Sequence, residues 1–154
     1  MAITISRFLS ATAIQGAADA FVETAITTDI VPANGFAFRL SRMVFDLSGG
    51  TSAVNNSILE FALSRDTKAA VPKYDDPDTL FYWARQTSFS TSGYVVNQNG
   101  FVLDFVEGIY VVDPTIYLQL DSNLTAVAQT MHARIYYEEV KLSEVEILRL
   151  LNNV

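Results

Sequence analysis

The chain has 154 residues and a mass of 17.0 kDa, a size that predicts one domain with a full hydrophobic core. It contains no cysteine and one histidine, which excludes a disulfide framework, a thiol nucleophile and a thiolate metal site. Half of its residues are apolar, which excludes a disordered chain, and 10 basic against 17 acidic side chains are spread so evenly that no segment forms a basic arm.

The small number of charges indicates that part of the surface is covered by another molecule. Only 18% of the residues are charged, against roughly 25% in soluble domains. A folded monomer of this mass exposes roughly 7,700 Å², or about 285 Å² for each charged side chain. We therefore expect a homo-oligomer or a larger assembly. No apolar run approaches the length of a membrane span, so no transmembrane segment is predicted.

Alternation of apolar and polar residues with a period of two predicts strands along most of the chain. The pattern begins at residues 3–6 and 22–30, and Pro32 with Asn34-Gly35 then predicts a turn. In the next strand the apolar residues change from even to odd positions near Ser41-Arg42, which predicts a bulge. Further predicted strands cover residues 59–63, 80–86, 94–98, 101–106, 109–112, 116–120 and 131–137.

Two turn signals in the second half of the chain shape the expected fold. Asn99-Gly100 lies between two alternating segments and predicts a tight hairpin, and Glu107-Gly108 predicts a further turn. Strands spaced by about ten residues, with few helical signals, are typical of an all-β fold. The expected architecture is an antiparallel β-sandwich, best matched by a Greek-key jelly roll, with an immunoglobulin-like strand order as the open alternative.

The period changes to 3.6 residues near the C-terminal end. Ser143 and Glu146 have the spacing of a capping box, which predicts a short helix. Helices of this length are marginal in water without packing, so we expect this one to dock on its own sandwich or on a neighbouring subunit. The candidate contact residues are Val145, Ile147, Leu148, Leu151 and Val154. The single domain is thus divided into an N-terminal arm or edge strand (1–20), the sandwich (21–140) and the capped helix (141–154).

Few residues offer chemistry. Asp75, Asp76 and Asp78 lie within four positions of one polar loop, and clustered carboxylates suit calcium. The spacing of an EF-hand and its closing glutamate are missing, so a solvated loop is the simpler interpretation, and no other cofactor is expected. His132 lies on the polar face of its strand without a second histidine, which favours an exposed or interfacial residue over a catalytic or metal-binding one.

Enzymatic activity is not expected, because the common nucleophile and phosphate-binding motifs are missing. A glycosidase with paired carboxylates is the open enzymatic alternative, but the separation of the two groups across a sheet cannot be taken from sequence. Direct nucleic-acid binding is not expected either. The nearest approaches to a basic patch are Arg39 with Arg42 and Lys68 with Lys73, and acidic neighbours dilute both pairs.

Aromatic residues provide a second functional hypothesis, a carbohydrate-binding or adhesin module located outside the cell or on its surface. Lectins are among the proteins built on sandwich folds. Strand parity places Tyr82 on one face and Phe81 with Trp83 on the other, so at most half of the candidate rings are exposed. The candidate rings are Tyr74, Tyr82, Trp83 and Tyr94.

The strands between Val22 and Tyr137, the loops rich in Ser, Thr, Asn and Gly, and the many Phe and Tyr residues resemble the single jelly-roll capsid proteins of icosahedral viruses. The resemblance implies a structural protein of the virion that assembles with copies of itself, and with other virion proteins, through lateral sandwich contacts. Capsid proteins that package RNA often carry an arginine-rich N-terminal arm, whereas residues 1–18 contain only Arg7. The resemblance therefore implies a shell whose inner wall faces a membrane or a protein, or a decoration of a phage head.

Overall fold

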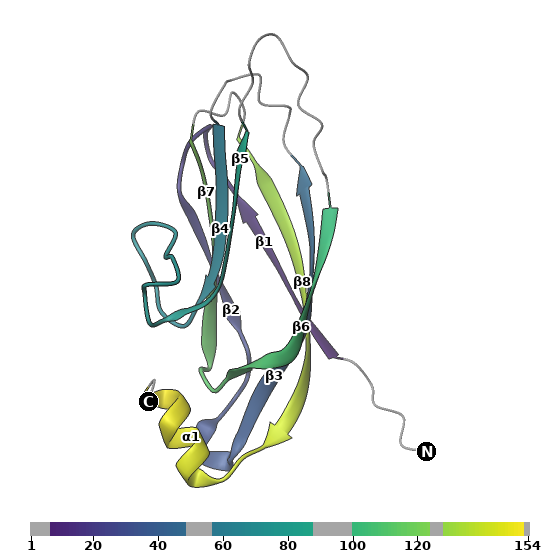
Figure 1. Ribbon diagram of the computed structural model, residues 1–154, viewed down its shortest axis with the longest axis vertical. Coiled ribbons are helices and arrows are strands. Elements are labelled where there is room, and N and C mark those ends of the chain that lie inside the picture. Colours follow the sequence, from purple (N-terminus) through teal and green to yellow (C-terminus); the bar gives the residue numbers. More distant parts are fainter. Residues whose placement is uncertain (1–6, 49–56, 88–99, 124–127, 153–154) are drawn as a thin grey trace.

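In the described residues, eight antiparallel strands form two four-stranded sheets that pack face to face (Figure 1). This computed structural model describes residues 7–48, 57–87, 100–123 and 128–152. A 3-10 turn, η1 (Pro32–Asn34), precedes the third strand, and the helix α1 (Glu144–Leu151) follows the last one. The strands are β1 (Arg7–Ile14), β2 (Val22–Thr27), β3 (Phe36–Ser48), β4 (Ser57–Ser64), β5 (Thr79–Thr87), β6 (Gly100–Val111), β7 (Thr115–Asn123) and β8 (Thr130–Lys141).

The strand order is that of a jelly roll. One sheet has the order β1-β8-β3-β6 and the other has the order β2-β7-β4-β5. The pairs β1 with β8, β2 with β7, β3 with β6, and β4 with β5 are those of one long antiparallel hairpin, which is wrapped so that alternate pairs fall in opposite sheets. This pairing gives the two Greek keys of a jelly roll. The predicted all-β sandwich and its Greek-key order are confirmed, and the immunoglobulin-like order is excluded.

The core lies between the two sheets and is rich in aromatic rings. The ring centroids of Phe45 and Phe61 are 4.6 Å apart, and those of Phe61 and Phe81 are 5.9 Å apart. Such pairs add to the stabilisation that comes from burying apolar surface. The inward positions alternate along each strand as predicted, and the buried residues include Ile26, Phe38, Leu40, Met43, Leu59, Leu63, Ile116, Leu118, Leu120, Met131 and Ile135.

The predicted bulge in β3 is confirmed, since the register with both neighbouring strands shifts between Leu40 and Arg42. On the β6 side, Leu40 is opposite Ile109 whereas Arg42 is opposite Asp104, so residues 105–108 bulge out of the ladder. The predicted turn at Glu107-Gly108 is wrong, because β6 continues through this point to Val111. Gly108 takes the left-handed φ of 75° that lets the strand bulge and then resume pairing.

Other local predictions have mixed outcomes. The turn at Asn34-Gly35 is confirmed, with Gly35 at φ 73° ending η1. The predicted strands at 3–6 and 94–98, and Asn99 of the predicted hairpin, lie outside the described residues, while Gly100 is the first residue of β6. The N-terminal segment contributes β1 as the edge strand of its sheet.

The segment between β4 and β5, residues 65–78, covers part of the outer face of the β2-β7-β4-β5 sheet. Gln119 is fully buried there, and its side-chain amide donates to Glu23 at 3.0 Å and to Ser64 at 2.6 Å. The Lys68 backbone N–H donates to the same Glu23 carboxylate at 2.9 Å, and the Thr67 hydroxyl donates to its other oxygen. Burial opposes ionisation of Glu23, but these hydrogen bonds outweigh it and lower its pKa.

Candidate functional site

The helix α1 is anchored on its own chain by one buried residue and one carbonyl contact. Ile147 is 5% exposed and packs with Ala37 and Val112, both fully buried. Arg65 donates from its guanidinium to the carbonyl of Leu150, one of the groups that a helix C-terminus leaves without a helical partner. The capping box of Ser143 and Glu146 is confirmed at the other end.

Among the described residues, no helix is long and apolar enough to span a bilayer.

Docking in its own chain places one candidate contact residue inside the molecule. Ile147 is buried because it packs against Ala37 of β3 and against Val112. Three of the other candidates are exposed, Val145 by 60%, Leu148 by 50% and Leu151 by 45%. Val154 lies outside the described residues.

The exposed apolar residues of α1 lie at the same end of the molecule as η1 and the start of β3 (Figure 1). Val31 and Phe36, which flank η1, are 53% and 42% exposed. We call the set of five the α1-end surface; its members are Val31, Phe36, Val145, Leu148 and Leu151. Exposed apolar side chains gathered at one place mark interaction sites more often than scattered ones do.

A first hollow in this surface lies between α1 and η1, and we call it the α1 hollow. Its volume is about 520 Å³. Pro32 and Ala33 form one side, and Leu148 and Leu151 form the other. Glu144 is the one charged side chain in its lining, so the hollow suits an apolar side chain.

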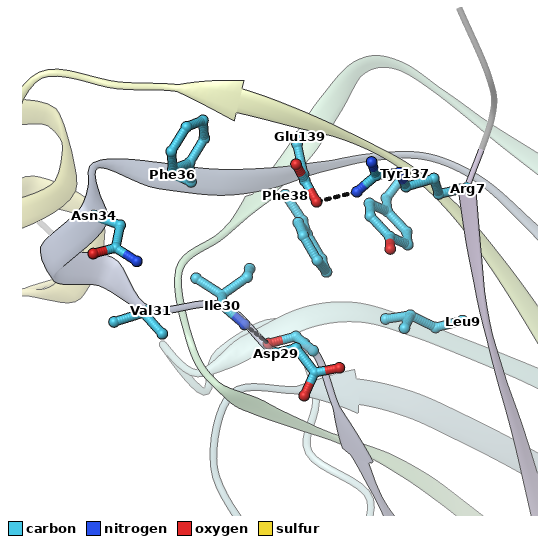
Figure 2. Close-up of a pocket in the computed structure, with 11 residues that line it drawn as sticks. Arg7, Leu9, Asp29, Ile30, Val31, Asn34, Phe36, Phe38, Tyr137 and Glu139 are labelled. Carbon is cyan, nitrogen blue, oxygen red and sulfur yellow. Dashed lines mark hydrogen bonds and ion pairs between the residues drawn. The ribbon is translucent and has the colours of Figure 1, made fainter.

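A second hollow, the β1 hollow, opens on the other flank of η1 (Figure 2). Its volume is about 320 Å³. The rings of Phe38 and Tyr137 stack inside it, with centroids 3.9 Å apart and an interplanar angle of 21°. Arg7 forms an ion pair with Glu139 at the rim. The hollow therefore gives access to aromatic side chains of the sandwich interior through a charged opening.

In the acidic loop, Lys68 forms ion pairs with two of the three carboxylates. The Lys68 ammonium lies 2.9 Å from Asp76 and 2.8 Å from Asp78. The hydrogen bond to Asp78 is the main cause of a raised pKa for Lys68. Asp75 is exposed. Across the part of the chain that the structure describes, no three Asp, Glu or His side chains converge as a metal ion requires.

The candidate aromatic platform is divided between the core and the surface, as the strand parity predicted. Trp83 stacks on Phe61 with centroids 5.1 Å apart, so its ring faces the core. Tyr82 points outward and donates its hydroxyl to Glu60 at 2.9 Å; burial and this carboxylate raise the pKa of Tyr82 to about 12. Tyr74 meets Tyr82 edge-on at 5.8 Å. Tyr94 lies outside the described residues, which leaves two rings of the four on the described surface.

The outer face of the β1-β8-β3-β6 sheet carries the remaining candidates. His132 is exposed, as predicted, and its Nδ1 lies 3.0 Å from the hydroxyl of Thr12. Arg39 and Arg42, the nearest approach to a basic patch on this face, each pair with a carboxylate, at 3.0 Å and 2.5 Å respectively. Each guanidinium group is therefore paired with a carboxylate of the same chain, although the buried Nε of Arg39 has no hydrogen-bond partner among the described residues.

Sequence reasoning missed two members of the α1-end surface. Phe36 shares its parity with the buried Phe38, which predicts an inward side chain, but Phe36 is the first residue of β3 and lies at the margin of the core. Val31 immediately precedes Pro32 of η1 and had no strand pattern to place it. The turn signal beside both residues is the feature that could have marked them, because a chain that reverses at the end of a sandwich exposes its neighbours.

Comparisons of the sequence and the structure with known proteins identify no family for this chain. No protein-family model matches the chain, and no characterised protein matches it in sequence. Among solved structures, it is similar to a chain in the X-ray structure of tomato aspermy virus, with a TM-score of 0.41 and 12% identity over 88% of this chain and 78% of that chain. A likeness at this level does not bear on function. The fold and surface define the class: among the described residues the chain is an antiparallel jelly roll with exposed apolar side chains at one end.

Proposed function

We propose that the chain is a structural subunit that assembles with copies of itself into a shell, as a capsid or virion coat protein does. The α1-end surface is the observation that carries the proposal. Leu148 and Val145 are half or more exposed, while Ile147 of the same helix is buried and fixes the helix in place. A rigidly held apolar surface loses little conformational entropy when it binds, which favours association.

The architecture and composition support the same function. Jelly rolls occur as capsid domains and as lectin domains. Trp83 is directed into the core, so fewer exposed rings remain to bind a sugar. This weakens the support for the lectin role. The low proportion of charged residues, 18%, leaves a surface that gains stability when like subunits cover one another.

Particle size tests this proposal directly. The purified full chain should form a species much heavier than a trimer in native mass spectrometry, with uniform particles in negative-stain electron microscopy. A 17.0 kDa monomer that persists in sedimentation at high protein concentration contradicts shell formation. Saturable binding on a glycan array by such a monomer, measured with and without a chelator, would instead support the carbohydrate-binding alternative.

A further inference from the structure

We infer that the β1 hollow binds a small organic amine, a molecule that joins a flat apolar ring to a positively charged ammonium group. The ring lies against the aromatic wall of the hollow, and the ammonium group pairs with the carboxylate of Asp29. All of the lining comes from one chain, so the inference goes beyond shell assembly. Its test is therefore independent of the test of the proposed function.

The walls of the β1 hollow suit a flat apolar ring. Its volume of about 320 Å³ is near the lower end of the range for ligand pockets, about 300–1,000 Å³. The stacked rings of Phe38 and Tyr137 line it together with Leu9 and Ile30. Phe38 and Ile30 are buried, so this wall is part of the packed sandwich. A ring placed against it gains dispersion contacts and aromatic stacking.

The charges of the lining favour a cation. The charged members are Arg7, Asp29 and Glu139. Arg7 and Glu139 pair with each other, whereas Asp29 is in no ion pair among the described residues. In Figure 2 the rings of Phe38 and Tyr137 lie between that pair and Asp29. The hollow therefore keeps one unbalanced negative charge on the far side of the rings.

The backbone presents Asp29 from a fixed position. Thr28 and Ile30, on either side of it, are buried. The Thr28 N–H donates to the carbonyl of Pro114 at 3.0 Å, and its hydroxyl donates to the carbonyl of Asp113 at 2.6 Å. Asp29 itself has a left-handed φ of 59° and is exposed. A carboxylate on backbone that is already ordered loses little further entropy when it binds a ligand.

Aromatic rings beside a carboxylate select an ammonium group over other head groups. The faces of aromatic rings attract cations, and a carboxylate accepts strong hydrogen bonds from them. Phe36, which is 42% exposed, adds a third ring to the lining. Asp29 would repel a ligand that carries a carboxylate or phosphate, and a neutral ligand would gain no ion pair there. The net charge of -7 also attracts cations to the chain.

Calorimetric titration of the full chain with two probes of the same shape tests the charge preference. Phenethylamine is charged at neutral pH, and phenethyl alcohol is its neutral counterpart. Phenethylamine should bind once per chain with a dissociation constant of about 1 mM or less. The alcohol should bind about tenfold more weakly, because it lacks the charge-assisted hydrogen bond. The absence of saturable binding, or equal binding of the two probes, overturns the inference.

Asp29→Asn tests the assigned carboxylate. Asparagine tolerates the same positive φ as aspartate, so the variant should remain folded, which circular dichroism checks. Its affinity for phenethylamine should fall about tenfold, while its affinity for the alcohol stays the same. Asp19→Asn is the matched control, since Asp19 also has a left-handed φ, 57°, but does not line the hollow. An equal loss in both variants would show unspecific attraction and overturn the inference.

Cysteine protection tests the location without changing Asp29. The chain has no cysteine, and Asn34 is an exposed residue of the lining. Saturating phenethylamine should slow the reaction of Asn34→Cys with N-ethylmaleimide about fivefold or more. Val106→Cys is the control, because Val106 is 99% exposed and lies outside the hollow. Its labelling should not change. Unprotected labelling of Asn34→Cys overturns the assignment to this hollow.

One further probe distinguishes a free amine from the side chain of a protein. A lysine amide acetylated at its α-amino group carries an ammonium group on an unbranched chain without a ring. It should bind more weakly than phenethylamine, and tighter binding would overturn the assignment to a free aromatic amine. Sedimentation of the same samples reports particle size, so a failed shell proposal and a failed ligand site give different results.

Discussion

The side chain of Arg39 lies across Gly108, where β3 and β6 change register. A Cβ atom at Gly108 would be 2.5 Å from Cγ and 2.9 Å from Cδ of Arg39, and 3.2 Å from the carbonyl oxygen of Leu40. Arg39 is held in turn by Glu138, whose carboxylate accepts a hydrogen bond at 3.0 Å. The bulge in β6 therefore depends on a position where only glycine fits.

Gly108→Ala should lower the free energy of unfolding by about 2 kcal/mol or more. The positive φ would strain an alanine, and its Cβ would clash with Cγ and Cδ of Arg39. Urea unfolding measures this change. Gly16→Ala is the matched control, since a Cβ at Gly16 meets nothing within 4 Å. The control should be neutral or slightly stabilising. Equal effects of the two substitutions would show that the bulge tolerates a side chain.

Ile147→Ala should detach α1 from the sandwich. The substitution removes buried methyl groups from the contact with Ala37 and Val112, at a cost of about 2–4 kcal/mol. Hydrogen exchange of the α1 amides should accelerate well before the sandwich unfolds. Val145→Ala, at a side chain that is 60% exposed, should leave that exchange nearly unchanged when measured on dilute protein. Unchanged exchange in the Ile147 variant contradicts docking on the chain's own sheet.

Glu23→Gln should change how stability depends on pH. The folded chain lowers the pKa of Glu23 below its ordinary value of 4.5, so the ionised group contributes stability above about pH 4.5 that is lost as the pH falls through the folded pKa. The variant should be less stable than wild type at pH 7, and the difference should shrink on acidification. Urea unfolding from pH 7 to pH 3 measures both curves. A constant difference would mean that the charge of Glu23 does not matter.

A control for this titration comes from the segment between β4 and β5, whose Thr67 and Lys68 donate hydrogen bonds to Glu23. Asp75→Asn removes an exposed carboxylate without touching the contacts of Glu23 with Thr67 and Gln119. Its stability curve should follow that of wild type over the same pH range.

Calcium should not stabilise the wild-type chain, because the Lys68 ammonium lies between Asp76 and Asp78. Thermal unfolding with calcium chloride or with a chelator should give the same melting temperature. A saturable rise with calcium would show that the lysine is displaced and that the three carboxylates bind the cation after all. Lys68→Met should cost about 1–3 kcal/mol, since it leaves two partly buried carboxylates without their counterion.

Much of the fold follows from local patterns. The change of parity near Ser41 predicts the bulge because a side chain must alternate between core and solvent. The capping box predicts the start of α1 because its hydrogen bonds are local. In contrast, β1 is inconspicuous because Ala11 and Ala13 are two of its inward residues, and small side chains give a weak period. Gly108 resembles a turn because a positive φ serves turns and bulges alike.

The candidate site is harder to predict because exposure depends on distant segments. The sequence of α1 identifies the apolar residues, but only the position of Ala37 on β3 decides that Ile147 is buried while Leu148 is not. In the same way, nothing local indicates that Lys68 reaches Asp76 and Asp78, which are eight and ten positions away. Which side chains of this loop pair with one another depends on the folded path of the whole segment, and a local sequence pattern does not specify that path.

Residues near both described ends of the chain line the hollows that flank η1. Arg7 lines one hollow with Asn34, and Leu151 lines the other with Pro32. A bulky label attached at Arg7 or Leu151 would consequently obstruct one of these hollows sterically. Labels for microscopy are better attached at Val106, which projects into solvent from the middle of the opposite edge strand of the β1-β8-β3-β6 sheet.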